Sequence, residues 1–396
     1  MSNTKRALMH AHTAYHINQF NIDNIKLLQE LGYQVDVACC WRDDDSALSP
    51  EALKAARERL EGMGCRIIET ASLRKIFNIP ELIRGYKQLK NACDEAHYQI
   101  VHTQSPIGGV ICRLAMKKAR KKYGTKVIYA AHGFHFFEGA PKKNWLIFFN
   151  AEKFCSKFTD VLITINKEDY INATERMYAD RVEYVSGAGV DTHKFVASSD
   201  AKARVRQELN LSDEDKVFLS VGELIPRKNH IEVFEALHLL DEQGVLNQNH
   251  IKYLIAGRGR CEDELKAKIS ELKLEKYVQM IGFRRDIADV FAASDIYVFP
   301  SHQEGLPVAL MEAMSVGMPC LVSKIRGNTD LIEEGKGGFF FNSKDATTLV
   351  TEIARILDES EDALHRMGEI NIKTMESFDK ATVNEQMKQI YMSLYQ

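Results

Sequence analysis

Two glutamates stand eight positions apart in the segment PSHQEGLPVALMEAMSVGMP, residues 300–319. Glu304 lies in a polar stretch after an apolar run, and Glu312 falls within an apolar pattern at helical spacing. A carboxylate among apolar side chains is costly unless it accepts hydrogen bonds, and vicinal hydroxyls of a ligand would supply two donors. The backbone N–H groups of Gly305 and Leu306, expected at the helix start, favour an anion such as a diphosphate. The structural alternative is one Glu that caps a helix and another that pairs with an Arg.

Histidines follow two other apolar runs. His132 and His135 come in the segment AHGFHFF, and His12, Thr13 and His16 come in HAHTAYHINQF. Both segments are expected at the carboxyl end of a strand, where polar side chains can meet a ligand. The alternative for any single His is a hydrogen-bonded structural role. For His10, His12 and His16 we predict no metal site, because no carboxylate or Cys lies close to them in the sequence.

The elements that must position these residues alternate along the whole chain. Apolar runs of strand length are followed by helical patterns, and the alternation restarts after SGAGVDTHKF, residues 186–195. This predicts an α/β protein of two doubly wound parallel sheets. Ligands bind such sheets outside the carboxyl ends of the strands, so a cleft between the two domains is expected. Strands are expected at 6–11, 33–40, 65–69, 98–103, 126–131, 160–165, 182–185, 216–222, 251–257, 277–282, 295–300, 318–323 and 338–342. Helices are expected at 18–32, 50–62, 79–96, 108–122, 143–157, 166–178, 229–242, 261–272, 285–293, 306–316 and 345–357, with a helical tail at 361–373 and 379–395.

Length and charge agree with two domains. The 396 residues exceed what one core usually organises, and the formal net charge of −3 excludes a strongly basic nucleic-acid-binding protein. Residues 1–188 hold 27 Lys and Arg against 21 Asp and Glu, a net charge of +6, and the remaining residues hold 25 against 34, a net charge of −9. This asymmetry indicates different partners for the two halves.

Eight cysteines without zinc spacing predict reduced, buried thiols in a cytoplasmic protein. No signal peptide is predicted, and no apolar run reaches membrane-spanning length. A basic segment, RLAMKKARKKYGTK at 113–126, is either a solvated face or a contact with anionic lipid headgroups, so the protein is expected to be soluble or peripheral on the inner face of the cell membrane.

The sequence resembles the retaining family-4 glycosyltransferases of the GT-B fold. EGLPVALME matches their E-x7-E motif, and SVGELIPRKNH (220–230), residues 282–319, AHGFHFFEGAPKKNW (131–145), ITINKEDY (163–170) and GAGVDTHKF (187–195) extend the resemblance over nearly the whole chain. These segments look like the branch that builds bacterial capsular polysaccharide, exopolysaccharide or O-antigen.

The resemblance implies a role for four positions of the site. Glu304 would contact the donor sugar, Glu312 the ribose hydroxyls and Lys228 the donor diphosphate, whose departing charge a cation stabilises. His132 would approach the sugar, donating a hydrogen bond from a neutral imidazole. The family often has an Arg where this sequence has Glu223, and a carboxylate there would repel phosphate.

Four further residues are candidates for donor contacts. Arg227 is a candidate for the cation missing at position 223, or else a surface Arg. Gly257, in the turn IAGRGR, would let the backbone approach the nucleotide, and Phe283 and Arg284, in GFRRD, would contact the base. For Phe283 the alternative is ordinary core. His12, Thr13, His16 and His135 are assigned to the acceptor side.

The implied reaction is transfer of a sugar from a nucleotide sugar, most simply UDP-linked, to a glycan hydroxyl with retention and without a metal cofactor. Residues 1–188 would bind the acceptor, which by resemblance is a polyprenyl-diphosphate glycan. Residues 189–374 would bind the donor. A helix at 375–396 would cross back to residues 1–188. The sugar is not defined by the sequence. Two alternatives are a UDP-sugar 2-epimerase and a non-catalytic nucleotide-sugar-binding subunit. The acidic run at residues 43–45 is interpreted as a solvated loop.

Overall fold

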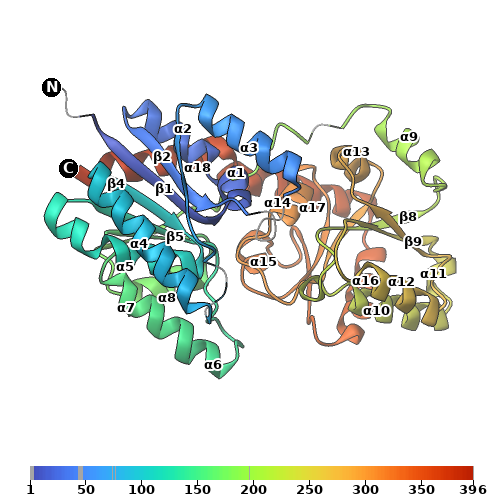
Figure 1. The fold of residues 1–396 in the computed structure, drawn as a ribbon. Helices are drawn as coiled ribbons and strands as arrows, with labels where there is room; N and C mark the ends of the chain where they lie inside the picture. Colours follow the sequence, from blue (N-terminus) through green and yellow to red (C-terminus); the bar gives the residue numbers. More distant parts are fainter. Residues whose placement is uncertain (1–3, 43–47, 74, 76, 196, 396) are drawn as a thin grey trace. The chain divides into compact units, whose positions relative to one another are not determined.

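The computed structural model describes residues 4–42, 48–73, 75, 77–195 and 197–395, so the acidic run at 43–45 lies outside the described residues. The chain divides into two compact units, unit 1 (Met1–Ala188 with Val383–Gln396) and unit 2 (Gly189–Thr382). Each unit is built on one parallel sheet (Figure 1). The returning segment was predicted to begin at residue 375, but residues 375–382 belong to unit 2. The reason is backbone pairing, since Val190 N donates to Phe378 O and Lys380 N donates to Val190 O.

Unit 1 contains a seven-stranded sheet in the order β3–β2–β1–β4–β5–β6–β7. Every pairing in it is parallel. The strand order runs outward from β1 in both directions, which is the doubly wound arrangement. The strands are β1 (Arg6–Thr13), β2 (Gln34–Cys40), β3 (Arg66–Glu69), β4 (Ile100–Gln104), β5 (Lys126–Ala131), β6 (Val161–Thr164) and β7 (Arg181–Tyr184). The helices are α1 (Ala14–Phe20), α2 (Ile22–Glu30), α3 (Pro50–Gly62), α4 (Ile79–Ala96), α5 (Pro106–Tyr123), α6 (Lys142–Asn144), η2 (Trp145–Phe149), α7 (Asn150–Ser156) and α8 (Lys167–Arg176).

Both faces of the unit 1 sheet are covered. Successive side chains of a strand point to opposite faces, so Ala7 and Met9 pack in one cluster with α2 and α18 (Lys380–Met392), while Leu8 packs in another with α4 and α5. All of these side chains are fully buried, which explains why the strands read as near-continuous apolar runs in the sequence.

Unit 2 repeats the same topology in the order β10–β9–β8–β11–β12–β13. The strands are β8 (Lys216–Val221), β9 (Ile251–Ala256), β10 (Val278–Gly282), β11 (Ile296–Phe299), β12 (Cys320–Ser323) and β13 (Gly338–Phe341). The helices are α9 (Ala201–Glu208), η3 (Pro226–Lys228), α10 (His230–Glu242), α11 (Val245–Gln248), α12 (Glu262–Glu271), α13 (Ile287–Ala292), α14 (Val308–Ser315), α15 (Asn328–Leu331), α16 (Ala346–Leu357), α17 (Glu361–Met375) and η4 (Glu376–Phe378), and η5 (Ser393–Tyr395) follows α18 in unit 1.

A few elements differ from the prediction. The helix expected at 18–32 is interrupted at Asn21, which separates α1 from α2. The helix expected from 306 begins at Val308, because Pro307 precedes it in an extended conformation. The helices α9, α11 and α15 were not predicted.

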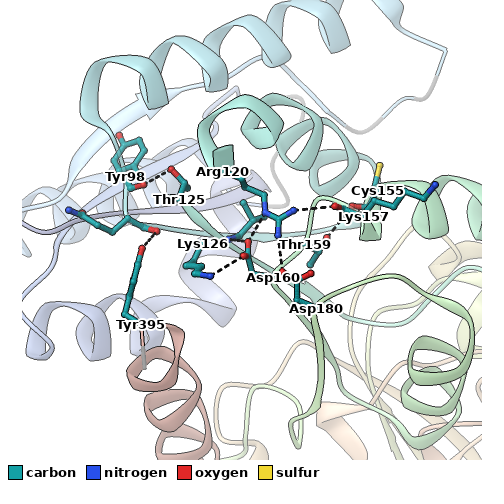
Figure 2. A network of polar contacts seen from close by, with 12 residues as sticks. Tyr98, Arg120, Thr125, Lys126, Cys155, Lys157, Thr159, Asp160, Asp180 and Tyr395 are labelled. Atoms are coloured by element: carbon teal, nitrogen blue, oxygen red, sulfur yellow. Dashed lines mark hydrogen bonds and ion pairs between the residues drawn. The ribbon is translucent and has the colours of Figure 1, made fainter. Parts of the chain in front are cut away.

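Part of the basic segment 113–126 serves the fold of unit 1. Arg113 is fully buried, and its Nη2 lies 2.6 Å from Glu152 Oε2. Arg120 donates to Asp160 and Asp180 and to the backbone of Lys157 (Figure 2). Asp160 also accepts from Val127 N, which ties α5 to the starts of β5 and β6. The exposed cations of the segment are Lys117, Lys118, Lys121 and Lys122.

All eight cysteines are free thiols and buried. Among the described residues, no helix combines the length and the apolar character needed to cross a membrane.

Candidate functional site

The best-defined polar cluster of unit 2 joins the loops that follow β8 and β11. Lys228 ends the short helix η3, and the left-handed Asn229 (φ 55°) turns the chain into α10. Lys228 Nζ donates to Glu304 Oε1 at 2.8 Å, and Arg227 Nη1 lies 2.7 Å from the same oxygen. The adjacent side chains Arg227 and Lys228 therefore reach one carboxylate, which the sequence did not establish.

The charges in this cluster control the ionisation of Glu304. Burial alone would raise the pKa of this carboxyl, which is 8% exposed, but Lys228 and Arg227 hold it below its usual value. Glu304 is therefore ionised at neutral pH. Arg227 stays partly exposed and also donates to Gln303 O, so it is a member of the cluster rather than a solvated surface Arg.

Glu312 lies in the second turn of α14 and is half-buried. Burial raises the pKa of its carboxyl to about 7, and Lys194 opposes that rise only in part. Among the described residues, no protein group donates a hydrogen bond to Glu312. A half-buried carboxylate that lacks donors is costly to ionise, which is the condition expected of a group that receives its donors from a ligand.

The amides of Gly305 and Leu306 precede the helix instead of lying in its first turn, since α14 begins at Val308. The backbone carbonyl of Gly305 lies against the loop that contains Gly327. A Cβ on Gly327, whose φ is +82°, would meet Gly305 O at 2.5 Å, so the two loops approach each other closely at the backbone.

The remaining donor candidates of unit 2 have different surroundings. A Cβ on Gly257 would lie 1.8 Å from Gly222 O, so this glycine permits the loops after β8 and β9 to pack against each other. Phe283 is 60% exposed, which excludes the core role considered for it. Arg284 is paired with Glu208 and, at 2.7 Å, with Asp286, so it would have to leave these carboxylates to reach a base.

In unit 1 the predicted histidines gather where β1 and β5 end. The ring of His16 lies 5.1 Å from that of His12 and 5.2 Å from that of His132, measured between centroids. Burial and the neighbouring His132 and His12 lower the pKa of His16 well below its ordinary value, and burial together with His12 lowers that of His132 to about 4. The imidazoles of His16 and His132 are therefore neutral at pH 7, as was expected for His132.

Thr13 and His135 lie outside the group of rings formed by His12, His16 and His132. Thr13 is buried and caps α1, accepting a hydrogen bond from His16 N. The His135 ring packs 4.7 Å from that of Phe148. Together with His12 and Ser105, these rings line a cavity of about 370 Å³ in unit 1, whose remaining walls are Leu73, Pro106 and Ile107.

Three buried polar residues of this region were missed. Gln104 ends β4 and hydrogen-bonds His132, Asn21 separates α1 from α2, and Ser105 has a left-handed backbone (φ 73°) with its Oγ buried and unpartnered among the described residues. For Gln104 and Ser105 a usable signal existed, because they directly follow the strand predicted at 98–103.

Among the described residues, no group of three or more His, Cys, Asp or Glu side chains is arranged to hold a metal ion. His10, which lies on β1, is buried and its Nδ1 lies 2.7 Å from Thr103 Oγ1.

Two family models match the chain in sequence. Residues 18–194 match "Glycosyltransferase Family 4", and residues 201–374 match "Glycosyl transferases group 1". EpsD of Bacillus subtilis (strain 168), whose name describes a glycosyltransferase, is 32% identical over 98% of this chain and 96% of its own length. The chain belongs to the family-4 glycosyltransferases. This glycosyltransferase is also 32% identical to an Escherichia coli UDP-Gal:alpha-D-GlcNAc-diphosphoundecaprenol alpha-1,3-galactosyltransferase, over 72% of each chain.

Solved structures confirm the GT-B fold of this glycosyltransferase. Anabaena HepE, determined in complex with UDP, matches with a TM-score of 0.75 at 18% identity and covers 98% of this chain and 100% of its own. Sucrose-phosphate synthase from Thermosynechococcus elongatus matches with the same TM-score at 17% identity over 99% of both chains. The glycosyltransferase therefore has the two Rossmann-like domains that the sequence predicted.

Proposed function

We propose that this glycosyltransferase moves a sugar from a UDP-sugar to a hydroxyl of a lipid-linked glycan in bacterial surface polysaccharide synthesis. The observation that carries the proposal is the placement of Lys228 and Arg227 on one oxygen of the buried Glu304. The two cations supply the charge that a departing diphosphate requires. The names of relatives support the substrates, since the E. coli relative uses UDP-Gal and a diphosphoundecaprenol-linked acceptor, and HepE binds UDP.

Unit 2 is the proposed donor-binding unit. The carboxylate of Glu312 would accept from the two ribose hydroxyls, and Glu304 would contact the sugar, with its charge kept by the neighbouring cations. A nucleotide diphosphate near Lys228 and Arg227 would compete with Glu304 for them, which frees the carboxylate for the sugar hydroxyls.

The proposed chemistry retains the anomeric configuration. The bond between the sugar C1 and the diphosphate oxygen breaks, a bond from C1 to the acceptor oxygen forms on the same face, and the acceptor proton passes to the departing diphosphate. Lys228 stabilises the charge on that leaving group, and no covalent nucleophile is assigned. The two cationic side chains supply positive charge at the diphosphate, so we propose that the reaction needs no metal.

Unit 1 is the proposed acceptor-binding unit. The cavity between His12, Ser105 and Phe148 offers an aromatic wall and a buried hydroxyl, which suit one face of a sugar ring and one of its hydroxyls. The exposed lysines of α5 would attract the anionic surface that carries a lipid-linked acceptor.

The test combines purified protein, a panel of UDP-sugars and a synthetic polyprenyl-diphosphate sugar. We expect transfer from one UDP-sugar, an α-linked product by NMR, and undiminished activity in EDTA. Glu304→Gln should abolish transfer. An inverted product would contradict retention, loss of activity in EDTA would contradict metal independence, and an epimerised sugar without acceptor would favour the epimerase. Donor binding without turnover on any acceptor would favour a non-catalytic subunit.

A further inference from the structure

A chain of hydrogen bonds in unit 1 ends at the imidazole of His132. It begins at the backbone carbonyl of His16, which accepts from Asn21 Nδ2 at 3.1 Å. Asn21 and Gln104 then bond side by side through their carboxamides. Gln104 Oε1 lies 2.7 Å from His132 Nε2. Asn21 is fully buried and Gln104 is 2% exposed, so water cannot replace any of these partners.

The direction of every bond follows from the first one. A backbone carbonyl only accepts, so the amide nitrogen of Asn21 must face His16 O. The same nitrogen donates to Gln104 Oε1 at 3.2 Å, and Gln104 Nε2 therefore donates to Asn21 Oδ1. This leaves an oxygen of Gln104 facing His132 Nε2. Because that oxygen can only accept, Nε2 must carry the proton.

We infer that Asn21 and Gln104 are positioning residues that fix His132 in the tautomer with the proton on Nε2 and leave Nδ1 as a hydrogen-bond acceptor. His132 would then accept a hydrogen bond from a substrate hydroxyl, whereas the sequence analysis assumed that it donates one. Among the described residues, Gln104 is the only group that hydrogen-bonds the ring. The ring also packs against the rings of His16 and Phe20, and His12 and His102 lie near it. His132 is partly exposed and its Nε2 is occupied by Gln104, so Nδ1 is the nitrogen left for a ligand.

The ionisation of His132 agrees with this geometry. Burial and the nearby His12 lower its pKa to about 4, so the ring is neutral at pH 7 and has one proton to place. Gln104 is an uncharged acceptor for that proton. A carboxylate in its place would stabilise the imidazolium and raise the pKa, which Gln104 does not do to the same extent. The contact with substrate rests on the role proposed for His132, but the tautomer does not.

The direct test is ¹⁵N NMR of the full chain labelled at histidine, with the His132 signals assigned by their loss in His132→Asn. At pH 7 we expect Nε2 to appear protonated and Nδ1 bare. A protonated Nδ1, or a charged ring, would overturn the inference. If the tautomer is found but no sugar is transferred, the proposed function fails and the inference stands. If sugar is transferred but the tautomer is not found, the inference fails and the proposed function stands.

Asn21 provides the sharper variant because it does not touch His132. In Asn21→Ala the amide of Gln104 is free to turn over, and we expect a mixture of His132 tautomers and a kcat reduced about tenfold, as for one lost hydrogen bond. Asn18→Ala, which removes a carboxamide from the preceding helix α1, should change neither. Unchanged tautomer populations in a folded Asn21→Ala would overturn the inference.

Gln104→Glu separates positioning from packing. Its carboxylate should keep the proton on Nε2 but raise the pKa of His132, so the acid limb of the rate profile moves to higher pH. A purely structural role for Gln104 would lower stability and leave that limb unmoved.

Discussion

Two cations, Lys228 and Arg227, contact one oxygen of the buried Glu304, and we expect Lys228 to contribute more to catalysis. Lys228 is 13% exposed at its side chain and Arg227 is 41% exposed, so Lys228 is the better shielded from solvent. A charge in such a place stabilises a developing negative charge more strongly than a solvated one.

Lys228→Ala should therefore lower kcat by about 10²–10³-fold, the range found when one preorganised donor is removed from a charged transition state. The measurement is the initial rate of transfer from the UDP-sugar. Lys336→Ala is the matched control, because Lys336 is an exposed lysine of the same unit that pairs with Glu333. A wild-type kcat in Lys228→Ala would remove this lysine from the mechanism.

The raised pKa of Glu312 predicts that donor binding releases a proton. Its pKa is raised from 4.5 to about 7 by burial, and hydroxyl donors from a bound ribose would favour the ionised form. Donor binding at pH 6 should therefore release a proton, measurable by titration calorimetry in buffers of different ionisation enthalpy. Glu312→Gln should abolish the release. In Glu232→Gln the release should persist, although burial raises the pKa of Glu232 to about 7 as well.

The same carboxyl links the stability of unit 2 to pH. The folded state holds the proton of Glu312 at pH values where the unfolded chain has lost it. The free energy of unfolding therefore falls as the pH rises from 4.5 to about 7. Glu312→Gln should flatten this fall. If the variant still released a proton on donor binding, that proton would come from a group other than Glu312.

At the scale of elements, substitution of two glycines by Ala should have opposite effects on stability. Gly257 is required by close packing, whereas Gly62 lies in open space in a helix. A Cβ at Gly257 would lie 1.8 Å from Gly222 O, whereas a Cβ at Gly62, in the last turn of α3, would meet nothing within 4 Å. Gly257→Ala should lower the free energy of unfolding of unit 2 by about 1–3 kcal/mol or more, because backbone must shift. Gly62→Ala should raise that of unit 1 by about 0.5–1 kcal/mol. Denaturant unfolding with unit-resolved hydrogen exchange measures both, and a stable Gly257→Ala would contradict the close contact.

The elements themselves were largely predictable, and the reason is the burial of the strands. Strands covered on both faces give apolar runs, and helices with a single buried face give 3.6-residue periods, so α3, α4 and β5 match their predicted ranges. The helix α9 was missed because its sequence, AKARVRQE, is mostly polar. Its Ala201, Val205 and Arg206 are nonetheless buried against unit 2.

The site was less predictable than the elements. The spacing of the two glutamates pointed to Glu304, and the family resemblance implied Lys228 and His132. Nothing in the sequence shows that Arg227 turns toward Glu304 or that Gln104 reaches His132. Both facts depend on which strands are neighbours in the sheets. Gln104 and His132 follow the paired strands β4 and β5, and Arg227 and Glu304 follow the paired strands β8 and β11, although each pair is separated by helices in the chain. Only the folded register supplies that information.

At the scale of the whole molecule, α18 carries the boundary between the units. Thr382 belongs to unit 2 and Val383 to unit 1, and both lie on this helix. The later turns bury Ile390 in the core of unit 1, and Tyr391 Oη lies 2.7 Å from His102 Nδ1 on β4. The last residues of the chain therefore stabilise the first domain.

Ile390→Ala should consequently weaken unit 1 alone. We expect a loss of about 2–5 kcal/mol in its free energy of unfolding, as for other large-to-small core changes, with an unchanged Kd for UDP. Hydrogen exchange should accelerate in β1, β2 and β4 and not in β8, β9 and β11, because the substituted side chain contacts only the former core. Glu385→Ala, an exposed change on the same helix, should do neither. Equal acceleration in both sheets would mean that the units unfold as one cooperative body, and the separation of donor-binding and acceptor-binding stability would then be wrong.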